Sequence, residues 1–128
     1  MKLYKFETSQ LTGHALDWAV AKCEGMRIEV RPKSACGRPL YVLAAEQGRE
    51  PWLWYPSTNW AQAGSIIERE NIGLVCQKIG STQGCAYRHT ENGEVFYYYG
   101  STPLIAAMRC YCCATLGDEI NIPEELCP

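Results

Sequence analysis

The sequence predicts an α+β fold, a single compact domain in which three helical segments pack on a sheet of about five mostly antiparallel strands. Its 128 residues are the length of one domain, so we treat residues 1–128 as a single unit. Segments with apolar residues three and four apart alternate irregularly with β-rich segments. The dipeptide Asn92-Gly93 lies between two strand-like runs and predicts a hairpin, which makes at least part of the sheet antiparallel.

The first helix follows a short strand at residues 2–7. Its N-cap is Ser9 or Thr12, and its apolar stripe continues to a stop at Gly25. The positions outside the stripe include His14 and Asp17, which we expect to face solvent. Strands are then predicted at residues 26–30 and 41–45, separated by a loop rich in proline and glycine.

Two further helices have clear end signals. Residues 60–70 form one, which Gly64 is expected to weaken or split. The last helix has Thr102 as its cap, Pro103 at its first position and Gly117 as its stop. The cap of the middle helix is one of three residues, Ser57, Thr58 or Asn59.

The strand-like regions include 73–79 and the two arms of the hairpin. A two-residue type I′ turn at Asn92-Gly93 would pair His89 with Phe96. The opposite face would then carry Arg88 beside Tyr97 and Tyr99. Either the Arg88 side chain extends over the rings and keeps its charge in water, or this face binds a ligand. Between the strand at 41–45 and the helix at 60–70, segment 51–56 contains two prolines, which exclude a helix interior and a central strand position.

Charge and composition exclude several classes of protein. The formal net charge of −2 argues against nucleic-acid binding, which depends on clustered Lys and Arg. The first ten residues lack the apolar run of a signal peptide, and no stretch is long enough for a membrane span, so we expect no membrane association and a cytoplasmic protein. In that compartment the eight cysteines are expected to be mostly reduced thiols.

Recognised catalytic and metal motifs are absent from the sequence, and we predict no catalytic residue, cofactor or metal. There is no Gly-rich dinucleotide or P-loop motif, no Gly-x-Ser-x-Gly and no His-Glu-x-x-His. The two histidines, His14 and His89, are more typical of structural or surface positions than of general acid–base groups. The pair Cys110 and Cys113 lacks a second ligand pair for zinc and lies inside a helix, which favours core packing.

One aromatic and polar segment is the candidate ligand site. Trp54 and Trp60 could stack on a base while neighbouring hydroxyls and an amide hold its edge. An arginine could meet a phosphate, and the starts of the last two helices offer free N–H groups to an anion. Tryptophans in a domain of this size otherwise serve as core or sheet cover. The candidate residues are Arg38, Trp54, Tyr55, Ser57, Thr58, Asn59, Trp60, Arg69, Thr102 and Arg109.

Three blocks of the chain resemble the NinX-like proteins of tailed phages and prophages, a family of small proteins of unknown function. The blocks are residues 11–25, 55–69 and 100–111, the last continued at residues 116–119. The resemblance implies a phage-encoded accessory protein of the host cytoplasm and supplies no catalytic residues.

Two functions from different classes follow from these observations. The first is a non-enzymatic module that binds or sequesters a nucleotide-like small molecule, such as a host defence signal. The second is an interaction protein that docks on a host or phage protein through aromatic side chains, since Trp, Tyr and Arg anchor such interfaces. A homo-oligomer fits either function, because small proteins often form symmetric assemblies.

Overall fold

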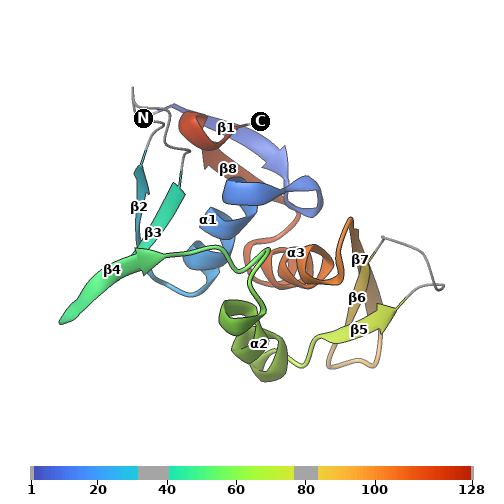
Figure 1. The fold of residues 1–128 in the computed structure, drawn as a ribbon. Coiled ribbons are helices and arrows are strands. Elements are labelled where there is room, and N and C mark those ends of the chain that lie inside the picture. Colours follow the sequence, from blue (N-terminus) through green and yellow to red (C-terminus); the bar gives the residue numbers. More distant parts are fainter. Residues whose placement is uncertain (1, 32–40, 77–83, 128) are drawn as a thin grey trace.

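The computed structural model describes residues 2–31, 41–76 and 84–127 (Figure 1). These residues form three α-helices and eight strands, and all strand pairs are antiparallel. The α+β class and the three helical segments are therefore confirmed. The described strands exceed the five expected, and they divide among three small sheets instead of forming one.

The first sheet joins the two ends of the chain. β1 (Leu3–Glu7) pairs with β8 (Glu119–Pro123), so that Tyr4 lies opposite Ile122. β1 was predicted and β8 was not. The sequence of β8 carries few local features of a strand, because it lies in an acidic segment and its pairing partner is at the other end of the chain.

The second sheet has the order β2-β3-β4. Its strands are β2 (Arg27–Arg31), β3 (Tyr41–Glu46) and β4 (Arg49–Leu53). Pro51 lies in β4, at the edge of the sheet, which agrees with the exclusion of a central strand there. A tight turn at Gly48, whose φ is 81°, connects β3 to β4.

The third sheet has the order β5-β6-β7 and contains the predicted hairpin. Its strands are β5 (Gly73–Cys76), β6 (Gly84–His89) and β7 (Val95–Gly100). The predicted register is wrong by one residue. Thr90 donates its backbone N–H to the Glu94 carbonyl oxygen at 2.8 Å, which closes a three-residue loop instead of a two-residue turn.

The cause of the register error is the backbone of the turn. A type I′ turn needs positive φ at both central residues, but here only Gly93 (φ 82°) has it and Asn92 does not. The observed register pairs Arg88 with Phe96 and Tyr87 with Tyr97. Arg88 therefore lies on the opposite face of the sheet from Tyr97, contrary to the prediction.

The three helices begin and end close to the predicted positions. They are α1 (Gly13–Cys23), α2 (Trp60–Arg69) and α3 (Pro103–Leu116). Asn59 caps α2 by accepting the Ala61 N–H at 2.9 Å, and Thr102 caps α3 by accepting the Ile105 N–H at 3.1 Å. α2 continues through Gly64 without interruption, so the expected split does not occur.

The core is organised around α3, which contacts α1, α2 and every strand of the third sheet (Figure 1). Leu16, Ile66 and Met108 are fully buried at these junctions, and Ile122 of β8 is fully buried in the same core. The approach of β6 to the start of α3 requires glycine, because a Cβ on Gly84 would lie 2.2 Å from the Pro103 nitrogen. This central helix leaves one face of the third sheet without a covering layer among the described residues.

Candidate functional site

A buried carboxylate ties the predicted ligand segment to α1. Asp17 is only 2% exposed, and its Oδ1 accepts the backbone N–H of Ser57 at 2.8 Å. The Trp54 indole donates to the Asp17 carbonyl oxygen at 3.0 Å. The expectation that Asp17 faces solvent is wrong, because the segment containing Trp54 and Ser57 covers this side of α1.

Burial changes the titration of this carboxyl. Loss of water raises the pKa of Asp17 from 3.8 to about 6, while hydrogen bonding from Ser57 opposes the rise by stabilising the charged form. The Ser57 Oγ is itself buried and has no partner of good hydrogen-bond geometry. The pair is enclosed, so it joins two segments of the fold and is not a group that a substrate can reach.

The two predicted stacking tryptophans have different environments. Trp54 is 6% exposed and belongs to the core, whereas Trp60, at the start of α2, is 54% exposed. Trp54 therefore has no free ring face for a ligand. The alternative interpretation of the tryptophans as core residues describes Trp54 and does not describe Trp60.

The polar residues of the same segment bond to their neighbours. The Tyr55 N–H donates to the Gln62 Oε1 at 2.8 Å, and Gln62 returns an N–H to the Leu53 carbonyl at 2.7 Å. The Thr58 hydroxyl donates to the Tyr55 carbonyl at 3.4 Å, and the Asn59 side chain caps α2. These contacts build the connection from β4 to α2.

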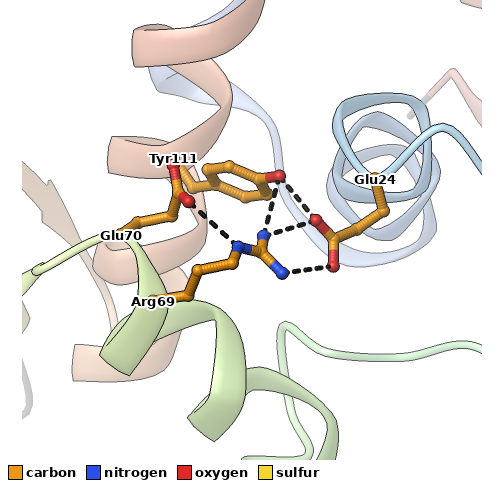
Figure 2. A network of polar contacts seen from close by, with 4 residues as sticks. All are labelled: Glu24, Arg69, Glu70 and Tyr111. Atoms are coloured by element: carbon orange, nitrogen blue, oxygen red, sulfur yellow. Dashed lines mark hydrogen bonds and ion pairs between the residues drawn. The ribbon is translucent and has the colours of Figure 1, made fainter.

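Arg69 is held in a network of polar side chains (Figure 2). Its guanidinium donates two hydrogen bonds to the Glu24 carboxylate, at 2.6 and 3.2 Å, and one to Glu70 at 3.0 Å. The Tyr111 hydroxyl donates to Glu24 at 2.6 Å and accepts from Arg69 at 3.1 Å. The network links α2 to the end of α1 and to α3. The positive charge of Arg69, which was predicted to bind a phosphate, is already paired with two carboxylates.

Thr102 and Arg109 form their hydrogen bonds outside this network. Arg38 lies outside the described residues. Thr102 uses its hydroxyl oxygen as a helix cap, as described above. Arg109, on α3, donates from Nε to the Leu11 carbonyl and from Nη1 to the Tyr99 carbonyl, both at 2.8 Å. The structure thus does not gather the candidate residues that it describes into one site.

Arg109 borders a groove beside β7. The groove has a volume of about 560 Å³ and is lined by residues 9–10, 97–101 and 109. Within the described residues Arg109 has no carboxylate partner, and its positive charge is balanced only by the dipoles of the two carbonyls. The groove therefore combines tyrosine side chains with an unpaired, half-buried cation.

The most exposed aromatic surface is one that the sequence did not locate. We define the aromatic face as the side of the third sheet opposite α3. Tyr97 and Tyr99 on this face are 55% and 58% exposed, and Tyr87 packs between Tyr97 and His89. The predicted register scattered these side chains over both faces, whereas the observed register brings them together. The aromatic face consists of Gly73, Val75, Cys85, Tyr87, His89, Val95, Tyr97 and Tyr99.

β7 also exposes its backbone, because it is an edge strand. Along an antiparallel strand pair, hydrogen-bonded residue pairs alternate with pairs that are not hydrogen-bonded. Because Thr90 and Glu94 are a hydrogen-bonded pair, the pairs that contain Val95, Tyr97 and Tyr99 are not hydrogen-bonded. Val95, Tyr97 and Tyr99 accordingly direct their N–H and C=O groups away from β6. The Tyr99 carbonyl is occupied by Arg109, and the groups of Val95 and Tyr97 are left for a further strand.

Most of the cysteines that the structure shows as free thiols are buried. The free thiols are Cys23, Cys85, Cys110, Cys112, Cys113 and Cys127. Burial raises the pKa of Cys110 to about 12 and that of Cys113 to about 11, so neither is a reactive thiolate at neutral pH. In residues 2–31, 41–76 and 84–127 no three His, Cys, Asp or Glu side chains are grouped to hold a metal ion. None of the described helices is long and apolar enough to cross a membrane.

The fold and its surface define a small α+β protein with one uncovered aromatic sheet face and an open strand edge. The family model described as Bacteriophage P22, NinX matches residues 7–114. The chain therefore belongs to this phage family, as the three sequence blocks predicted. No curated protein matches the chain.

Proposed function

We propose that this NinX-family protein is a phage accessory protein that binds a host or phage protein in the host cytoplasm through its aromatic face. The observation that supports the proposal is the uncovered position of Tyr97 and Tyr99 on the third sheet. Tyrosine side chains are enriched at protein interfaces, where they contribute large contact areas and a hydroxyl at low entropic cost. The segment that the sequence favoured for a ligand is instead occupied by contacts within the fold.

The charge distribution of this face fits a protein partner. Its side chains include no carboxylate, lysine or arginine, and depletion of charge is typical of the centre of an interface. Arg88, which the predicted register placed beside the tyrosines, lies on the other side with its guanidinium 5.6 Å from the Phe96 ring. A protein that binds to this face would therefore exclude water from the rings and hydroxyls without burying an unpaired charge.

Affinity capture from infected cells tests the proposal with two matched variants. Tyr97→Ser combined with Tyr99→Ser removes the centre of the aromatic face, whereas Tyr55→Ser combined with Trp60→Ser removes two exposed rings elsewhere. We expect a partner that is retained by the wild type and by the Tyr55/Trp60 variant and lost from the Tyr97/Tyr99 variant. Retention of every enriched protein by the Tyr97/Tyr99 variant would contradict the proposed surface.

A second candidate is the binding of a nucleotide-like small molecule, favoured by Arg109 in the groove beside Tyr97 and Tyr99. An arginine without a carboxylate partner suits a phosphate, and the tyrosine rings suit a base. Calorimetric titration with cyclic and ADP-ribose-type nucleotides tests this function. Heat that disappears in the Arg109→Lys variant supports it, and flat titrations of the wild type exclude these ligands.

A further inference from the structure

The open edge of β7 fits a second copy of the same strand. We infer that two copies of this protein pair their β7 strands antiparallel about a two-fold axis at Tyr97. The two three-stranded sheets would then join into one continuous sheet. This inference concerns self-association and does not depend on the proposed partner or ligand.

The register of such a pair follows from the backbone groups that are free. Tyr97 directs both N–H and C=O outward, so two Tyr97 residues facing each other exchange both hydrogen bonds. In this register Val95 lies opposite Tyr99 of the second copy. The Val95 C=O would accept the Tyr99 N–H, and the Tyr99 carbonyl, which has two lone pairs, would accept the Val95 N–H in addition to its bond from Arg109.

The same register brings opposite charges together. With the axis at Tyr97, Glu94 of the second copy lies opposite Gly100, one residue beyond the carbonyl that holds Arg109. Neighbouring strands are about 4.8 Å apart, which is within reach of a glutamate and an arginine side chain. Strand alternation directs Glu94 to the α3 side, where Arg109 lies. Neither residue has an ion-pair partner among the described residues, and the two-fold axis forms the contact twice.

The sequence of β7 lacks the features that keep edge strands apart. Residues 95–100 contain no charge and no proline, the features that commonly protect an edge strand from pairing. Strand pairing also places the two aromatic faces on the same side of the joined sheet, because residues directly opposite each other share a face. A dimer would therefore double the exposed aromatic surface around the Tyr97 pair.

Sedimentation equilibrium under reducing conditions tests this inference. We expect the wild type to sediment at twice its chain mass of 14.4 kDa at high concentration. Glu94→Arg places two arginines at each contact and should weaken the dimer about tenfold or more. Glu50→Arg makes the same change of charge on the exposed β4 edge and should leave the dimer unchanged. Circular dichroism confirms that each variant is folded.

A second variant tests the backbone ladder separately from the charges. Tyr97→Pro removes an N–H that β6 does not use, so the hairpin keeps its internal hydrogen bonds while the dimer loses two. We expect this variant to be monomeric. A monomeric wild type at roughly millimolar concentration, well above typical dissociation constants, overturns the inference. A dimer that tolerates both Glu94→Arg and Tyr97→Pro overturns it as well, since it must use another surface.

Discussion

Asp17 on α1 and Ser57, forty residues later, are joined by a buried hydrogen bond of 2.8 Å whose acceptor is a carboxyl with a raised pKa. The folded-state pKa of about 6 exceeds the ordinary value of 3.8. Between these two values the folded protein holds more protons at Asp17 than the unfolded chain does. We therefore expect the free energy of unfolding to fall as the pH rises from 4 to 7, by about 2 kcal/mol from this group alone.

The matched variant for this prediction is Asp17→Asn. Its amide oxygen still accepts the Ser57 N–H, and it does not titrate. Urea unfolding at pH 4, 5, 6 and 7 should show a smaller decrease of stability with pH in the variant than in the wild type. Parallel curves for the two proteins would mean that Asp17 titrates normally in the folded state.

The Tyr111 hydroxyl should stabilise the junction of the three helices (Figure 2). It donates to Glu24 and accepts from Arg69, so Tyr111→Phe removes two hydrogen bonds to charged groups. We expect a loss of about 1–2 kcal/mol in the free energy of unfolding, measured in urea. Tyr97→Phe is the control, because Tyr97 is 55% exposed. Equal stability of the two variants would show that the network contributes nothing measurable.

Two glycines should respond in opposite directions to the same substitution. Gly84→Ala drives a Cβ into the backbone at the start of α3, and we expect a loss of about 2 kcal/mol or more from overpacking. Gly64→Ala has open space around the new Cβ inside α2 and should stabilise by about 0.5–1 kcal/mol. Thermal and urea unfolding measure both. A Gly84→Ala variant as stable as the wild type would contradict the close approach of β6 and α3.

Local signals were sufficient to predict the helices. Asn59 and Thr102 carry side chains that accept the first free N–H groups, and Gly117 ends α3 with a positive φ. Each of these effects acts within one turn of helix, so the sequence pattern contains it. Gly64 has the helix-weakening tendency that was predicted, but packing of the neighbouring Ala63 and Ile66 in the core keeps α2 continuous.

Two of the errors involve contacts between distant segments, and a third comes from the conformation of a single turn residue. Helical periodicity assigned Asp17 to solvent, yet Ser57 covers it from another part of the chain. β8 forms by pairing with β1, and its own sequence does not require a strand. The aromatic face was missed because one turn residue, Asn92, keeps a negative φ and shifts the register by one position.

Cys23 at the end of α1 should be more reactive than the three buried thiols of α3, Cys110, Cys112 and Cys113. A hydrogen bond from the Cys112 side chain lowers the pKa of Cys23, whereas burial raises the pKa of Cys113 to about 11. Thiolate is the reactive form, so iodoacetamide at pH 8 should alkylate Cys23 before Cys110, Cys112 and Cys113. Peptide mapping by mass spectrometry gives the rates. The Cys112→Ala variant should slow alkylation of Cys23 and Cys110→Ala should not, and an unchanged rate in Cys112→Ala would rule out this activation.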